Sequence, residues 1–182
     1  MRWRTDRFKL LPAVAVLLGV AAICRADEPP REYKVKAAFI YNFAQFVDWP
    51  ETAFTTADAP FVVAVVGKDP FEGILEQVVA GKRVGARRVV VQHFDSADQI
   101  GACQILFVPT TEDDSLSRII QKVQNSAVLT IGESEDFCSS GGFIRLFTED
   151  NKVRFEINQE AAEQAGLRIS SKLLKLARIF KK

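Results

Sequence analysis

The sequence predicts an α/β protein with three layers: a mostly parallel central sheet, helices on both of its faces, and a C-terminal antiparallel hairpin. Two observations support this fold class. Between residues 61 and 131, four short apolar runs alternate with helical patterns, as in strand–helix–strand units of a parallel sheet. Between residues 143 and 158, two segments of alternating polarity flank a polar turn, which is typical of a half-buried hairpin.

The first predicted helix covers residues 32–48, where apolar side chains recur at helical spacing. The stripe expected to face the core consists of Val35, Phe39, Phe43, Phe46 and Val47. Four polar side chains of the segment are expected in solvent: Lys34, Lys36, Gln45 and Asp48. Trp49-Pro50 should end the helix, because the residue before a proline avoids the helical region.

The parallel part of the sheet is expected to contain four strands, at residues 61–67, 88–94, 103–108 and 127–131. The first is apolar throughout, which is typical of a strand covered on both faces. Three connections are predicted: a helix from Asp69 and Pro70 to about Val79, a short helix or turn over 95–102, and a helix from Asp114 or Ser115 to about Gln124. The last of these should bury Leu116, Ile119, Ile120 and Val123.

The C-terminal part begins with strands at 143–148 and 152–158 around the turn Glu149-Asp150-Asn151. A short helix over 159–165 should end at Gly166. Ser170-Ser171 is then expected to cap an amphipathic final helix. Its inward side chains would be Leu173, Leu174, Leu176, Ala177 and Phe180.

Residues 1–26 have the pattern of an export signal. Four cations precede an apolar stretch of 11 residues, and Cys24 and Ala26 occupy the small positions before a cut at Asp27. The apolar stretch is shorter than the roughly 20 residues of a membrane span. We therefore expect a periplasmic protein whose single domain is residues 27–182; an uncleaved anchor or lipidation at Cys24 are the alternatives.

The expected mature chain has 19 cationic and 22 acidic residues, a net charge of −3. Phosphate backbones require a cationic surface, so nucleic acid is not an expected partner. The mature chain keeps two cysteines, Cys103 and Cys138. If the strands beside them are parallel neighbours, the two thiols lie at opposite ends of the sheet, too far apart for a disulfide.

Nothing in the sequence identifies a catalytic residue, a metal site or a cofactor. His93 is the only histidine, and a metal or a catalytic base needs converging partners that the sequence alone does not supply. The segment 81–85 lacks a phosphate-loop pattern and is expected to be a turn. The segments 67–70 and 139–142 follow strands, where open α/β sheets bind ligands. In the first, Asp69 would repel an anion at the helix start, and in the second, turn geometry explains the glycines. A binding protein is therefore expected rather than an enzyme.

The candidate binding residues are Arg154, Glu156, Asn158 and Arg168. The first three share one face of a strand, because side chains alternate with period 2. Arg168 follows the helix stop at Gly166 and could approach that face. The alternative is a solvated sheet face with no partner.

Two long segments resemble the YfiR-like family of exported bacterial proteins. They are EYKVKAAFIYNFAQFVDWP at residues 32–50 and GGFIRLFTEDNKVRFEINQEAAEQAGLRISSKLLKLA at residues 141–177. VVGKDPFEGILE and CQILFVP, between them, are also similar to that family. The resemblance covers nearly all of the mature chain.

The resemblance implies a dimeric periplasmic regulator that represses an inner-membrane diguanylate cyclase by binding its periplasmic sensor domain, which lowers cyclic di-GMP signalling and biofilm formation. It also implies that Glu156 and Arg168 contact the partner or a small ligand. The chain departs from the family in keeping only Cys103 and Cys138 of the expected redox-sensitive pairs. Two alternatives remain: a small-molecule sensor acting on a histidine kinase or another membrane receptor, and an enzyme of unknown type.

Overall fold

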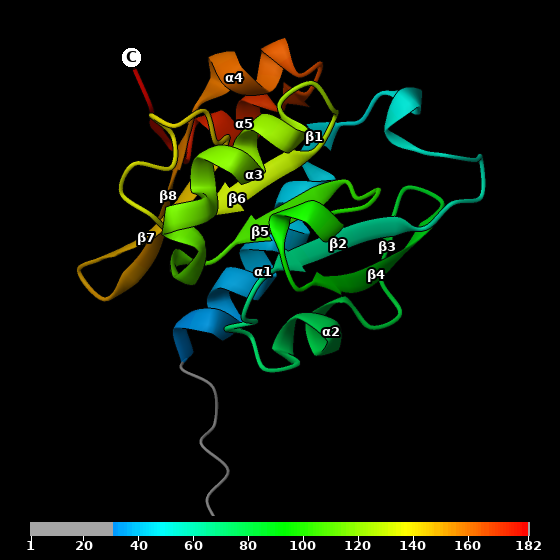
Figure 1. Ribbon diagram of the computed structural model, residues 1–182, viewed down its shortest axis with the longest axis horizontal. Coiled ribbons are helices and arrows are strands. Elements are labelled where there is room, and N and C mark those ends of the chain that lie inside the picture. Colours follow the sequence, from blue (N-terminus) through cyan, green and yellow to red (C-terminus); the bar gives the residue numbers. More distant parts are fainter. Residues whose placement is uncertain (1–30, 182) are drawn as a thin grey trace, which may run out of the picture.

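The computed structural model describes residues 31–181. The predicted export signal lies outside these residues. An eight-stranded sheet has the order β10-β8-β7-β6-β5-β2-β4-β3, and β1 and β9 form a separate two-stranded sheet. Figure 1 shows the large sheet crossing the molecule, with α4 and α5 gathered at one end.

The strands are short, and the final helix is shorter than the sequence predicts. The strands are β1 (Val47–Asp48), β2 (Phe61–Val66), β3 (Arg83–Val84), β4 (Arg87–Phe94), β5 (Ile105–Val108), β6 (Leu129–Gly132), β7 (Ile144–Glu149), β8 (Lys152–Ile157), β9 (Arg168–Ile169) and β10 (Arg178–Ile179). The α-helices are α1 (Arg31–Gln45), α2 (Ile74–Val79), α3 (Leu116–Val123), α4 (Gln159–Gln164) and α5 (Ser171–Leu174). Three 3₁₀ turns cover Glu51–Ala53, Ala97–Gln99 and Thr110–Ser115.

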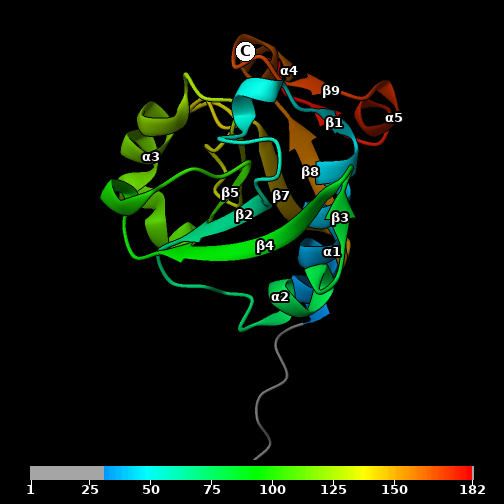
Figure 2. The ribbon, with the colours of Figure 1, turned by 90° about the vertical axis from the view of Figure 1, so that its right-hand side faces the viewer.

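The predicted fold class is confirmed. Strands β4, β2, β5, β6 and β7 run parallel, and β8 returns antiparallel to β7. Helices α1 and α2 cover one face of the sheet and α3 covers the other (Figure 2). The hairpin turn is tight, because Asp150 and Asn151 both adopt positive φ.

Helix α1 buries only part of the stripe that the sequence predicts. Phe43 is buried as predicted, and Phe39 packs against the core. Val35 and Phe46 are 39% and 38% exposed, and Ala37 and Ile40 are buried beside Phe43. Lys36, expected in solvent, is buried. The predicted stripe runs past the end of the helix at Gln45, so Phe46 and Val47 do not continue its helical spacing.

Three predicted helices were wrong in extent. Helix α1 ends at Gln45 rather than at Asp48, and Val47–Asp48 form β1. Helix α2 begins at Ile74 rather than at Pro70. The Asp69 carboxylate accepts a hydrogen bond from the Phe71 N–H and so forms a local turn before the helix. Glu72 then adopts positive φ, which is not a helical conformation, and the start of α2 is delayed. The final helix ends at Leu174, and the chain continues as β10 beside β8. Leu176, expected to face inward, is 75% exposed.

The helix α3 prediction is confirmed, since Leu116, Ile119, Ile120 and Val123 are all buried. The two cysteines of the described chain are free and buried. Strands β5 and β6 are parallel neighbours, so Cys103 before β5 and Cys138 after β6 lie toward opposite ends, as predicted. Burial raises the pKa of each thiol to about 12, so both remain protonated at neutral pH.

None of the helices among residues 31–181 combines the length and the hydrophobicity that crossing a bilayer requires.

Candidate functional site: the outer face of the C-terminal hairpin

The face of β7 and β8 that points away from α1 carries a cluster of charged side chains around one aromatic ring. The opposite face packs on α1, where the rings of Phe43 and Phe155 have centroids 5.1 Å apart. Alternation along each strand therefore sends Arg145, Phe147 and Glu156 to the outer face. We call this surface the hairpin face and define it as Arg145, Phe147, Glu149, Arg154, Glu156 and Arg178.

Strand register places these groups beside one another. Arg145 lies opposite Glu156, and Phe147 lies opposite Arg154. On the other side of β8, Arg178 of β10 is also aligned with Glu156. Glu156 therefore has an arginine on each neighbouring strand.

Aromatic and ionic contacts hold the arginines over Phe147. The guanidinium carbons of Arg145 and Arg178 lie 5.1 Å and 4.7 Å from the centre of its ring. Arg178 also forms an ion pair with Glu149 at 2.9 Å. Arg154 is exposed and forms no ion pair within the described chain.

The centre of the hairpin face is largely desolvated but incompletely paired. The side chains of Arg145 and Glu156 are only 17% and 13% exposed, yet their closest charged atoms are 3.8 Å apart. The Nε of Arg145 is buried and has no hydrogen-bond partner. A buried guanidinium with a spare donor favours an added acceptor, such as a carboxylate or phosphate.

The four residues predicted from the sequence lie at three different places in the fold. Arg154 and Glu156 lie on the hairpin face, although Glu156 is far less exposed than expected. Asn158 lies at the start of α4 and is engaged within the fold. Arg168 is exposed on β9, which pairs with β1 rather than with the large sheet. No hydrogen bond or ion pair joins the Arg168 side chain to the other three among the described residues.

The amide of Asn158 has two structural partners. Its Oδ1 accepts a hydrogen bond from the Ala161 N–H at 3.1 Å, which caps α4, and its Nδ2 donates to the Cys138 carbonyl at 2.9 Å.

We expect Asn158→Ala to lower the free energy of unfolding by about 1 kcal/mol, since that is the usual contribution of an N-cap. Urea denaturation measures this. Asn125→Ala, on a surface loop after α3, is the matched control and should change stability by less than about 0.5 kcal/mol. Equal stability of both variants would contradict the structural role of Asn158.

Arg145, Phe147 and Arg178 were missed in the sequence analysis. Arg145 and Phe147 lie on one face of β7, but the strand that completes the site is β10, in a segment that the sequence predicts to be helix. The signal that could have revealed it is the pair Ile179-Phe180, since β-branched and aromatic residues are enriched in strands.

The loops singled out in the sequence have mainly structural roles. Gly67 adopts positive φ, and Glu112 packs so closely on it that a side chain there would clash. Residues 81–85 contain β3 and two positive-φ glycines, a turn as predicted. The loop 139–142 closes over the ring of Phe137, and the Gly142 N–H donates to the Phe137 carbonyl at 2.9 Å.

A family model described as YfiR/HmsC-like matches residues 33–178. Among solved structures, a conserved domain protein from Vibrio cholerae O1 biovar eltor is similar, with a TM-score of 0.56 and 13% identity over 82% of this chain and 60% of that one. The ABC domain from Streptococcus pneumoniae, solved in complex with L-Trp, has a TM-score of 0.50 and 12% identity over 66% of this chain and 55% of that one. This chain thus spans less than two thirds of either neighbour, and both similarities concern the fold alone.

Proposed function

This chain belongs to the YfiR/HmsC-like family, and from that premise we propose that it is a periplasmic regulatory protein that represses an inner-membrane diguanylate cyclase. It would bind the periplasmic sensor domain of the cyclase and lower cyclic di-GMP signalling. The observation that carries the proposal is the family match over residues 33–178. Export through residues 1–26, homodimer formation and the absence of catalysis are parts of the same proposal.

Repression requires a difference in affinity. A regulator shifts the cyclase toward its inactive arrangement only if it binds that arrangement more tightly than the active one. The protein surface that makes this difference must contact the sensor domain. We propose the hairpin face for that role, together with Arg168 as the family resemblance suggests.

The chemistry of the hairpin face supports a binding role. Its arginines and its aromatic ring belong to the residue types that contribute most to protein interfaces. Two arginines are held over Phe147, so they lose little conformational freedom when a partner binds. Arg154 and Arg168 are exposed and available to acidic groups.

The incomplete pairing of Arg145 supports a second candidate function, a sensor of a small molecule. A ligand with a carboxylate or phosphate could accept from the free Nε of Arg145. The occupied protein would then act on a histidine kinase or another membrane receptor. The two functions differ in the identity of the membrane protein that binds.

We expect membrane capture with the protein as bait to recover a protein that carries a diguanylate cyclase domain, identified by mass spectrometry. Arg154→Ala and Arg168→Ala should each weaken that binding at least fivefold, about 1 kcal/mol. Their thermal melts should stay near wild type, because exposed polar substitutions usually change stability by less than about 0.5 kcal/mol. Cells producing either variant should contain more cyclic di-GMP.

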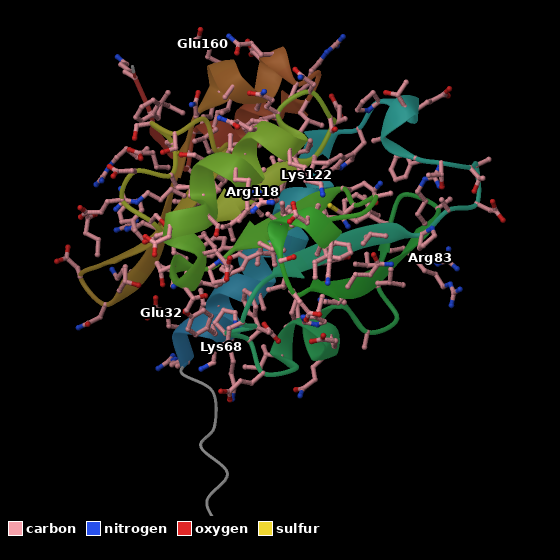
Figure 3. All side chains as sticks on the ribbon, in the orientation of Figure 1. Glu32, Lys68, Arg83, Arg118, Lys122 and Glu160 are labelled. Atoms are coloured by element: carbon pink, nitrogen blue, oxygen red, sulfur yellow. The ribbon has the colours of Figure 1, made fainter. Side chains whose placement is uncertain are left out.

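The matched control is Arg118→Ala. Arg118 is an exposed arginine of α3 that is not part of the hairpin face, and its one ion pair among the described residues is with the exposed Asp98 (Figure 3). This variant should bind like wild type. Wild-type binding by the Arg154 and Arg168 variants would remove these residues from the interface, and recovery of a kinase instead of a cyclase would favour the second function.

A further inference from the structure

Three metal-ligating side chains meet on the other half of the sheet, remote in the strand order from the hairpin face. They are Asp69, Glu76 and His93, and one ligand atom from each lies within 4.8 Å of the other two. Asp69 belongs to the loop after β2, Glu76 to α2 and His93 to β4. They come from three consecutive parts of one strand–helix–strand unit.

The parallel pairing of β2 and β4 creates this meeting. His93 lies beside Val65, and the Gly67 N–H donates to the Phe94 carbonyl at 2.8 Å, so the two strands end together. His93 follows Val89 and Val91 on alternate positions, which places it on the face of the sheet that α2 covers. The helix that connects the two strands therefore lies directly over the histidine.

The carboxylates are partly held in place. The Nε2 of His93 is 2.7 Å from Oε1 of Glu76. The second oxygen, Oε2 of Glu76, is buried and has no hydrogen-bond partner. One oxygen of Asp69 accepts from the Phe71 N–H at 2.9 Å, which fixes the direction of its carboxylate. The Glu76 carboxylate thus keeps one oxygen free to accept a donor or a cation, and the side chains of His93 and Glu76 are 42% and 43% exposed, so ions from solvent can reach the cluster.

We propose that Asp69, Glu76 and His93 form a binding site for a divalent transition metal, with Zn²⁺ the best match. One imidazole and two carboxylates are ligands that zinc accepts, and a water molecule would complete four-coordination. Zinc–ligand bonds of about 2.0–2.2 Å place ligand atoms roughly 3–4 Å apart, so small side-chain rotations suffice. The ion would replace the hydrogen bond between His93 and Glu76 and satisfy Oε2.

Bound zinc would join the β2–α2 loop, α2 and β4. A ligand that binds only the folded state stabilises it, so the melting temperature should rise with zinc concentration. This inference is independent of the repressor proposal, since zinc binding is measured without any partner.

The test uses tag-free protein treated with EDTA and titrated with ZnCl₂ in a calorimeter. We expect one site, a zinc-dependent rise in melting temperature, and a shift of the imidazole nitrogen signals in NMR spectra. The NMR assignment is unambiguous because His93 is the only histidine in the chain. Cys24 and the buried cysteines cannot produce that imidazole signal.

Two variants decide the identity of the site. His93→Gln and Glu76→Gln keep hydrogen-bonding groups but remove a metal ligand, and each should weaken zinc binding at least tenfold. Asp95→Asn is the matched control, because Asp95 is an acid two residues from His93 that lies outside the cluster. Absence of zinc binding, unmoved imidazole signals, or equal affinity in His93→Gln would each overturn the proposal.

Discussion

Lys36→Met should lower the free energy of unfolding by about 3–5 kcal/mol, because it leaves a buried carboxylate without its partner. The Lys36 ammonium contacts Glu133 and lies 2.5 Å from Glu32. The side chains of Lys36 and Glu133 are only 6% and 7% exposed. Methionine is similar in length to lysine and keeps much of the packing, so the decrease in the free energy of unfolding reports mainly the removal of the charge.

The double variant Lys36→Met with Glu133→Gln should recover most of the stability, since removal of both buried charges is often nearly neutral. Glu32→Gln is the milder control: Glu32 is more exposed, and its loss should cost less than about 1 kcal/mol. Urea denaturation at neutral pH measures all three. A single Lys36→Met variant as stable as wild type would show that the ion pair is not needed for folding.

The same pair has a defined pH dependence. Burial disfavours the charged ammonium, but the hydrogen bonds to Glu133 and Glu32 outweigh burial and raise the pKa of Lys36 above 10.5. A group whose pKa is raised by folding stabilises the protein below its unfolded pKa. The contribution of Lys36 is therefore complete at neutral pH and is lost only as the pH rises through the raised value.

Gly142→Ala should destabilise the protein by about 3 kcal/mol, through a clash in the interior. A Cβ at Gly142 would lie within 3.0 Å of the Phe137 ring, and so would a Cβ at Gly132, the last residue of β6. Phe137 is fully buried, and protein interiors are close-packed, so its ring can move only by displacing neighbouring side chains. Neither glycine has positive φ, so steric overlap rather than backbone strain causes the loss.

Gly101→Ala is the matched control for this variant. Gly101 also lacks positive φ, and a Cβ there would lie 3.5 Å from the Phe94 ring, an ordinary contact. Its melting temperature should stay close to wild type. Gly142→Ala combined with Phe137→Leu should be more stable than Gly142→Ala alone, because the smaller side chain relieves the overlap; no improvement would argue against the steric explanation.

The parallel strands and α3 could be predicted because their patterns are local. Residues 61–66 are apolar throughout, and the helix α3 has four inward residues at helical spacing. The hairpin was predictable for the same reason, since Asp150 and Asn151 tolerate positive φ. Within each of these segments, the intrinsic preference of the residues and the pattern of buried positions predict the same secondary structure.

The elements that the sequence misplaced depend on competing local or distant contacts. Asp69 and Pro70 are good helix starters, but the Asp69 side chain forms a turn that delays α2. The end of the chain has the apolar spacing of a helix, yet residues 178–179 pair with β8. Open backbone groups at a sheet edge favour pairing over a short, poorly covered helix.

By itself, the sequence determined the fold class, the strands of the parallel sheet, the hairpin and the two free cysteines at opposite sheet ends. Tertiary structure alone decided which polar groups meet. Glu133 lies 97 residues from Lys36, and Glu76 lies 17 residues from His93. Periodicity reports which face of an element is buried. It carries no information on which distant side chain supplies the opposite charge, because that depends on how the elements pack.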